Sequence, residues 1–211
     1  MDKRKHLTRD EIARLLVAVR KAKFAIRDEC MIQLCFFHGL RVSELTRLTL
    51  ADIDIEGGEI FIRRLKKGLC TVQPICREES PILKQWLALR KSWPGEESGL
   101  LFLSRLGTPM SRQQVYVLFK KYGLAAKLSI SVHPHMLRHA CGYALADSGS
   151  DTRLIQDYLG HKNIKNTVIY TAGNAGRFRG IWETEGEKNL PFWPKLTTRI
   201  NYFGLMSNSS C

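Results

Sequence analysis

Cationic side chains and one tyrosine stand in this chain at spacings that suit chemistry on a phosphate group. His135 and Arg138 are three residues apart, so in a helix they lie on one face. His161 and Tyr170 are nine residues apart with a helical pattern between them, so both can reach one pocket. Arg41 stands at the start of another short helical segment. Together these residues offer fixed cations and a nucleophile.

Cleavage of a phosphodiester without a metal ion needs groups of these types. Fixed cations stabilise the pentavalent transition state, which carries extra negative charge, and a guanidinium binds two phosphate oxygens at once. A tyrosine nucleophile forms a phosphotyrosine ester, which keeps the bond energy for rejoining, so ATP is not required. The leaving oxygen needs an acid, and Lys66 or Lys67 in the turn before Gly68 can supply a proton.

The elements that must position these residues are predicted to be mainly helical. Thr8 and Glu11 form a capping box that opens a helix. A nearly all-apolar segment from about residue 26 to 38 predicts a buried helix, and Gly39 suits its C-terminal cap. Further helices are predicted over residues 42–48, 81–91, 111–122, 134–148, 151–159 and 164–171.

A small antiparallel sheet is predicted after the first helices. Apolar residues at 53 and 55, a turn at 56–59, a strand at 60–62, the lysine turn and a strand at 71–75 read as a meander. The apolar run 100–103 fits either a strand or core filler. The fold class is therefore mainly α with a small antiparallel β-sheet (α+β), in one compact domain. The composition changes after Trp182, which predicts an arm or a partly disordered tail.

The charge of the chain favours a polyanionic partner. Lys and Arg number 33 against 20 Asp and Glu, a net charge of +13. This surplus suits nucleic acid first and an acidic membrane surface second, although a basic surface without a partner is the simpler alternative. The sequence shows no signal-peptide core and no run of about 18 apolar residues, so we expect a soluble, cytoplasmic protein without membrane contact.

The cysteines and histidines do not form the patterns of a metal site. The six cysteines are irregularly spaced, and Cys30, Cys35 and Cys141 fall in apolar helical patterns typical of core positions. His133 and His135 flank Pro134, and no cysteine or carboxylate stands where it would complete a ligand set. We therefore expect no metal and no cofactor.

Three segments of the chain resemble the signature boxes of the tyrosine recombinases, the integrase family. They are Arg-Val-Ser-Glu-Leu at 41–45, His-Met-Leu-Arg-His at 135–139, and Leu-Gly-His at 159–161 followed by Tyr-Thr at 170–171. Their order and intervals match, and with the hairpin lysine they span residues 41–171. The resemblance implies the catalytic-domain fold of these DNA breaking and rejoining enzymes over residues 1–182, without a separate N-terminal core-binding domain. The tail, 183–211, would be disordered or dock on a neighbouring subunit.

The resemblance also implies six catalytic residues: Arg41, Lys66, His135, Arg138, His161 and Tyr170. The two arginines would clamp the scissile phosphate, His161 would bind a nonbridging oxygen, and His135 would assist proton transfer at the tyrosine nucleophile. Lys66 is favoured over Lys67 as the acid for the leaving 5′ oxygen, because Pro74 follows it at the family's usual distance.

Other residues are expected to support catalysis or face DNA. Glu44 and His139 would stand behind the catalytic groups, with Glu44 orienting Arg41 or its neighbours. Basic residues are expected on the DNA-facing surface, namely Arg47, Arg64, Lys67, Arg112 and Arg177.

A closer resemblance links the chain to the short fimbrial phase-variation invertases of enteric bacteria. It rests on the phrases at residues 64–68, 103–105, 111–114, 151–161 and 174–178. It implies inversion of a promoter-bearing segment flanked by inverted repeats, by four protomers on two double-stranded DNA sites. Because no N-terminal clamp domain precedes the boxes, DNA-bending accessory proteins are expected as partners.

Two other functions fit the same fold. A DNA-binding transcriptional regulator could keep the fold without cleaving, although a pure binder has no need of a nucleophile. A type IB topoisomerase has similar chemistry but would relax supercoils as a monomer without paired sites. The fimbrial phrases favour recombination.

Overall fold

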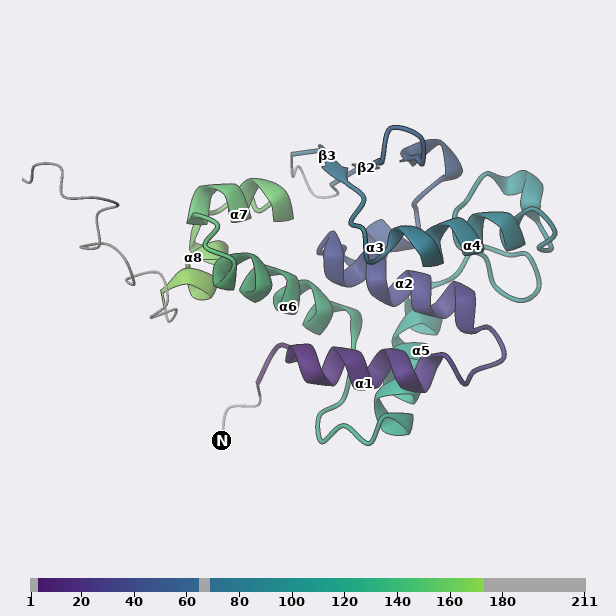
Figure 1. Ribbon diagram of the computed structural model, residues 1–211, viewed down its shortest axis with the longest axis horizontal. Helices are drawn as coiled ribbons and strands as arrows, with labels where there is room; N and C mark the ends of the chain where they lie inside the picture. The colour runs from purple at the N-terminus through teal and green to yellow at the C-terminus, as the bar shows by residue number, and fades with distance from the viewer. Residues whose placement is uncertain (1–3, 65–68, 173–211) are drawn as a thin grey trace, which may run out of the picture. The chain divides into compact units, whose positions relative to one another are not determined.

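The computed structural model describes residues 4–64 and 69–172, which fall within one compact unit, Met1–Arg177 (Figure 1). Several predicted features lie outside the described residues: Lys66, Lys67, Arg177 and the tail 183–211. The expectations for them remain predictions.

The first two helices form as the sequence predicts. α1 (Arg9–Val19) begins at a capping box in which the Thr8 side chain accepts from the Glu11 amide at 3.2 Å and the Glu11 carboxylate accepts from the Thr8 amide at 2.9 Å. α2 (Ala25–Phe37) is buried along most of its length. Gly39 follows it with φ of 55°, a left-handed conformation that favours glycine, so the chain turns sharply toward Arg41.

The later helices confirm the predicted sequence of elements, with shifted ends. They are α3 (Val42–Leu45), α4 (Ser80–Arg90), α5 (Arg112–Ala125), α6 (Pro134–Asp147), α7 (Thr152–Leu159) and α8 (Lys165–Thr171), with 3₁₀ turns at Leu50–Asp52 and Glu96–Ser98. α3 is shorter than the predicted 42–48. The Thr49 amide donates to the Asp52 carboxylate at 2.9 Å. This contact caps a separate 3₁₀ turn, so the α-helix does not continue through this segment.

The sheet is the predicted antiparallel meander, in the order β1-β2-β3. Its strands are β1 (Ile53–Asp54), β2 (Glu59–Ile62) and β3 (Thr71–Pro74). Ile60 and Ile62 point into the core, whereas Phe61 pairs with Val72 on the exposed face. The run 100–103 is mainly core filler, since its ends make only isolated bridges, Thr49 with Leu100 and Leu103 with Pro109.

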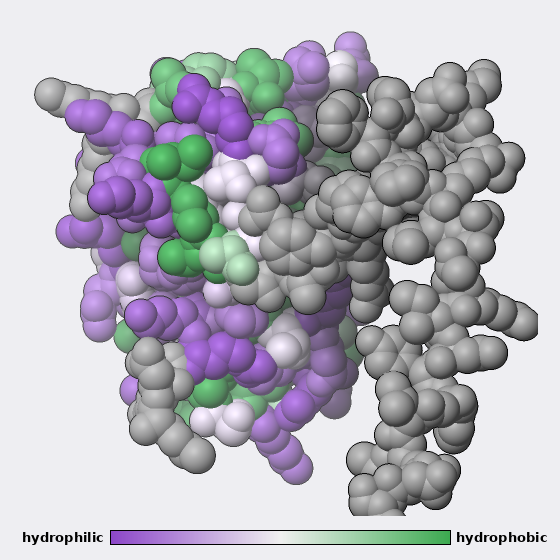
Figure 2. All heavy atoms as spheres, turned by 90° about the vertical axis from the view of Figure 1, so that its left-hand side faces the viewer, coloured by the Kyte–Doolittle hydropathy of each residue, from purple (hydrophilic) through white to green (hydrophobic). Residues whose placement is uncertain are grey.

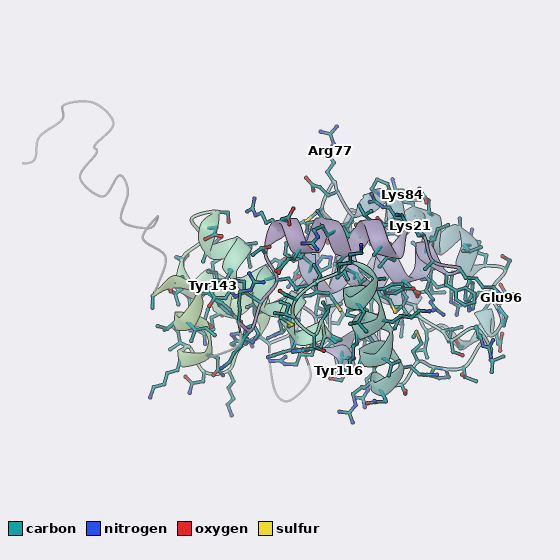
Figure 3. All side chains as sticks on the ribbon, turned by 90° about the horizontal axis from the view of Figure 1, so that it is seen from below. Lys21, Arg77, Lys84, Glu96, Tyr116 and Tyr143 are labelled. Carbon is teal, nitrogen blue, oxygen red and sulfur yellow. The ribbon has the colours of Figure 1, made fainter. Side chains whose placement is uncertain are left out.

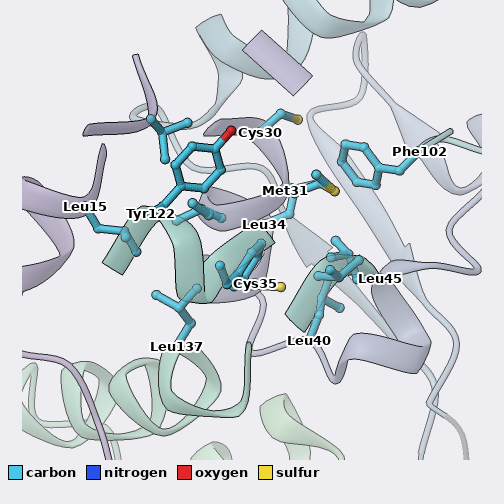
Figure 4. Close-up of a cluster of buried hydrophobic side chains, with 14 of the residues drawn as sticks. Leu15, Cys30, Met31, Leu34, Cys35, Leu40, Leu45, Phe102, Tyr122 and Leu137 are labelled. Carbon is cyan, nitrogen blue, oxygen red and sulfur yellow. The ribbon is translucent and has the colours of Figure 1, made fainter. Parts of the chain in front are cut away.

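The hydrophobic core surrounds α2. Met31, Leu34 and Cys35 of this helix are at most 1% exposed, and Tyr122 of α5 and Leu137 of α6 pack around them (Figure 4). Full burial of a side chain of this size stabilises the fold by about 1.5–3 kcal/mol. The packing of α6 against α2 holds the predicted His135–Arg138 pair close to the loop that carries Arg41. The predicted core cysteines 30, 35 and 141 are all buried.

The described surface is largely hydrophilic on the side of α7 and α8, where separate apolar areas interrupt it (Figure 2). Arg77 projects away from the ribbon (Figure 3). Within residues 4–64 and 69–172, no helix combines the length and apolar character that crossing a membrane requires.

Candidate active site

Arg41 is held by a carboxylate of its own helix. It is the N-cap of α3, and its amide and its guanidinium donate to the two oxygens of Glu44, at 2.9 and 2.6 Å. The Arg41 side chain keeps 27% of its surface exposed, whereas that of Glu44 keeps 1%. The pair therefore presents a guanidinium at the surface and anchors it from below.

Two buried arginines also lie close to the Glu44 carboxylate. Arg64 donates to Oε2 at 2.9 Å, and a guanidinium nitrogen of Arg138 lies 3.9 Å from the same oxygen. The side chains of both arginines are at most 1% exposed. Glu44 therefore stands between three guanidinium groups, which leaves the cluster with more positive than negative charge.

The charge imbalance shows in the ionisation of the cluster. Burial alone would raise the pKa of Glu44, but Arg64, the Arg41 amide and Arg138 outweigh it and lower that pKa. Burial, followed by repulsion from Arg41 and Arg64, lowers the pKa of Arg138 to about 9. Excess buried positive charge is costly without an anion, so the cluster is electrostatically suited to a phosphate.

Arg138 and Arg64 join the segments that carry the site. Arg138 donates to the carbonyls of Gly39 and, at 2.7 Å, Leu159. Arg64 donates to the carbonyls of His38 and Tyr158, at 2.9 and 2.6 Å. The two arginines thus tie the loop after α2 to the end of α7.

Arg64 differs from its predicted role on the DNA-facing surface. Its side chain is fully buried, so it contacts protein groups in this structure and not the solvent. The strand pattern contained the signal: Ile60 and Ile62 are buried on alternate positions, and the same period brings Arg64 inward. A Cβ at Gly160 would lie 2.6 Å from Cγ of Arg64, so glycine is needed where the arginine passes.

Tyr170 lies on α8, packs against α6 and is 2% exposed. Its hydroxyl lies 3.0 Å from Nδ1 of His139. Its ring meets the edge of Tyr143 at 5.1 Å, and a Cβ at Gly142 would approach its Cζ to 2.6 Å. Burial is the main cause that raises the pKa of Tyr170 to about 12, against the lowering effect of Arg138.

His135 and His139 lie one helical turn apart on α6, and their rings meet edge to face at 4.4 Å. His135 is exposed at the surface. Partial desolvation of its ring, followed by repulsion from Arg138, lowers its pKa. His139 is more enclosed, and burial followed by repulsion from His135 and Arg138 lowers its pKa to about 4. Both rings are therefore neutral near pH 7, but they face different surroundings.

His161 lies beside the ring of Tyr170. The two rings are nearly parallel, 6.3 Å between centroids. Nδ1 of His161 is 2.9 Å from the hydroxyl of Thr167, so Nε2 is the nitrogen that can face a substrate. Burial, then repulsion from Arg138 and Arg41, lowers the pKa of His161 to about 3. A phosphate bound to these arginines would offset that repulsion.

A buried polar network that the sequence did not predict lies behind the site. Nδ1 of His38 lies 2.9 Å from Oε1 of Gln73, and Nε2 lies 3.1 Å from Glu79. Gln73 also donates to the Tyr158 carbonyl at 2.8 Å. The network ties β3 to the end of α7. The sequence contains one signal of this network: His38 and Gln73 are polar residues in otherwise apolar helix and strand patterns.

The structure thus brings together five of the six predicted catalytic residues, and the sixth, Lys66, lies outside the described residues. Glu44 contacts Arg41 and Arg138, and His139 contacts Tyr170 and the ring of His135. Arg47 and Arg112, predicted to face DNA, are exposed.

Comparisons with known proteins agree with this arrangement. Residues 5–177 match the phage integrase family. The chain is 54% identical over 181 residues to the type 1 fimbriae regulatory protein FimB of Escherichia coli K12, which covers 86% of this chain and 90% of that protein. It is 48% identical over 184 residues to FimE of the same strain, covering 87% and 93%.

The fold also matches solved recombinases. A XerH site-specific recombinase bound to palindromic difH substrate, in a post-cleavage complex, gives a TM-score of 0.70 at 26% identity. The match covers 85% of this chain and 53% of the recombinase, so the chain spans about half of that protein's length.

Proposed function

The chain belongs to the phage integrase family and is a site-specific tyrosine recombinase, and we propose that it inverts a promoter-bearing DNA segment that controls fimbrial expression. The observation that carries the proposal is the identity of 54% to a type 1 fimbriae regulatory protein, over nine tenths of that protein's length. A likeness of this extent covers the whole site and the surfaces around it.

In the proposed reaction, Arg41 and Arg138 hold the scissile phosphate and Tyr170 attacks it, which forms a 3′-phosphotyrosine. His161 donates from Nε2 to a nonbridging oxygen, and Lys66 protonates the leaving 5′ oxygen. Three guanidinium groups around the single carboxylate of Glu44 support this assignment, because the excess charge matches the anion that accumulates in the transition state.

The proposed partners follow from the reaction. Inversion requires two double-stranded DNA sites in opposite orientation, so we expect a tetramer on the synapsed DNA. DNA-bending accessory proteins would bring the sites together. The exposed Arg47 and Arg112 are proposed to contact DNA phosphates. Lys67 and Arg177, which the sequence also predicts to face DNA, are proposed to do the same. The enzyme would work in the cytoplasm.

An inversion assay tests the proposal. A reporter promoter would be placed between the inverted repeats of a type 1 fimbrial switch, in cells without other such recombinases, and the orientation read by restriction of the amplified segment. We expect inversion with the natural chain and none with Tyr170→Phe, which lacks only the hydroxyl.

Other outcomes would replace the proposal. DNA retardation without a covalent adduct would identify a DNA-binding regulator. Relaxation of supercoiled plasmid without paired sites would identify a topoisomerase. A covalent adduct without inversion would limit the conclusion to recombination at a different target.

A further inference from the structure

The hydroxyl of Tyr170 forms a hydrogen bond with His139, a histidine that the sequence predicts to support the catalytic residues without being one of them. The phenolic oxygen lies 3.0 Å from Nδ1 of His139, and the two rings meet at 61° with 5.8 Å between centroids. His161 is oriented differently, since its ring is nearly parallel to that of Tyr170 and its Nδ1 is held by Thr167.

His139 is in the right state to accept a hydrogen bond. Its surroundings disfavour a charged ring, because the ring is half-buried and faces other cationic or basic groups, namely His6, His133, His135 and Arg138. A neutral imidazole carries one proton. With that proton on Nε2, Nδ1 offers a lone pair, and the hydroxyl of Tyr170 donates to it.

We infer that His139 is a catalytic residue that accepts the proton of the Tyr170 hydroxyl during DNA cleavage. This inference rests on the proposed function and assigns one of its steps. A general base must lie within about 2.6–3.2 Å of the proton donor, and the observed separation of 3.0 Å meets that requirement.

The step balances with groups of the enzyme and DNA. The proton of the Tyr170 hydroxyl moves to Nδ1 of His139 while the phenolic oxygen bonds to phosphorus. The bond from phosphorus to the 5′ oxygen breaks, and that oxygen takes a proton from the acid, for which Lys66 is proposed. In rejoining, the 5′ hydroxyl attacks, and the tyrosine oxygen leaves with the proton from His139.

Substrate binding would strengthen His139 as a base. Arg138 repels a proton on this ring, and an incoming phosphate would offset that charge. The proton also has a route to solvent, since His139 lines a pocket together with Arg4, Lys5 and His135. His135 lines the same pocket and is exposed, so it is placed to meet the DNA and not the buried hydroxyl.

A single-turnover cleavage experiment tests the inference. The substrate is a nicked duplex that traps the covalent adduct, prepared with either a normal 5′ oxygen or a 5′-bridging sulfur at the cleaved bond. Sulfur leaves without a proton, so it reports on the nucleophile alone. The variants are His139→Asn, His139→Ala and His135→Asn, which tests the competing candidate for the proton acceptor on the same helix.

His139→Asn separates proton acceptance from hydrogen bonding, because the amide oxygen of Asn accepts a hydrogen bond near the position of Nδ1 but does not take up a proton. We expect it to slow adduct formation about 100-fold or more, by the same factor with oxygen and sulfur substrates. Added imidazole should restore cleavage to His139→Ala, which provides a second measurement if Asn disturbs packing.

Three results would overturn the inference. His139→Asn could cleave within about threefold of the natural chain, which would mean that hydrogen bonding is sufficient. The defect could disappear with the sulfur substrate, which would move His139 to the leaving-group side. His135→Asn could show the predicted pattern in place of His139→Asn. Failure of the natural chain to form any adduct is a distinct result, which would overturn the proposed function itself.

Discussion

Within residues 4–64 and 69–172, two buried clusters of arginine and carboxylate differ in charge balance. On α2, Arg27 pairs with Asp28 at 2.7 Å, and Tyr122 donates to the second oxygen of Asp28. One cation faces one anion, and the remaining donor of Arg27 reaches the Leu103 carbonyl at 3.0 Å. The cluster around Glu44 sets three guanidinium groups against one carboxylate.

The difference in charge distinguishes a structural cluster from the proposed phosphate-binding site. A buried pair with matched charges needs nothing more, whereas surplus buried cations are stabilised when an anion arrives. The fold supports that surplus with backbone carbonyls, which accept from Arg64 and Arg138 at the junction of α7 with the loop after α2. Matched substitutions in the two clusters should therefore have different effects on cleavage and on stability.

The largest contrast is expected between Arg138→Met and Arg27→Met. Loss of Arg138 should slow covalent adduct formation about 100- to 1,000-fold, because a donor to the transition-state charge is removed. Loss of Arg27 should leave the cleavage rate of folded protein unchanged but cost about 3–5 kcal/mol of unfolding free energy, because Asp28 is left buried without its ion partner. Urea unfolding and single-turnover cleavage measure the two effects; equal cleavage rates for both variants would refute the comparison.

Glu44→Gln and Asp28→Asn form the second pair. Both substitutions remove a buried anion, and each should lower the unfolding free energy by about 3–5 kcal/mol. Sulfate stabilises proteins in general, and the rise in Tm of Asp28→Asn measures that general effect. The Tm of Glu44→Gln should rise further, because sulfate also binds its unpaired arginines. Identical sulfate responses would show that the Glu44 cluster does not attract anions.

A smaller effect is expected from two glycines. Gly142→Ala would push a Cβ to 2.6 Å from the Tyr170 ring, and Gly123→Ala would push one to 2.5 Å from Val132. The first should slow cleavage about 10- to 100-fold by displacing the nucleophile. The second should cost about 1–3 kcal/mol of stability and leave cleavage intact. The account of Tyr170 fails if Gly142→Ala cleaves at the natural rate.

The last prediction concerns pH. His139 and His161 have pKa values lowered to about 4 and about 3, so the unfolded chain binds their protons first as pH falls below about 6.5. The stability they contribute is complete above that pH and is lost as pH falls toward the folded values. Urea unfolding at pH 7, 6 and 5 should therefore show decreasing stability. Replacing both histidines with Asn should flatten this dependence; an unchanged slope would place its origin elsewhere.

The secondary structure and the proximity of the proposed catalytic residues were largely predictable from the sequence, because they depend on local patterns and on the order of motifs along the chain. The capping box at Thr8, the glycine after α2 and the alternation along β2 are short-range patterns. The signature boxes occur in their family order, so the gathering of Arg41, Arg138 and their partners could be anticipated before the structure.

Contacts between side chains from distant segments were less predictable. Arg64 lies 94 positions from the Tyr158 carbonyl that it binds, and His139 lies 31 positions from Tyr170. Sequence periodicity indicates which face of an element is buried, but not which partner a buried polar group meets there. Strand alternation could still have identified Arg64 as inward-facing, since two buried isoleucines precede it at the same period.

Tyr170, held beside the surplus cations, is proposed to become covalently linked to DNA. To test this, the adduct would be trapped on a nicked duplex and digested, and the DNA-linked peptide identified by mass spectrometry. We expect a single modified residue, Tyr170, and no adduct in Tyr170→Phe. A link through Tyr143, which packs against Tyr170 at 5.1 Å, or through any other residue, would contradict it.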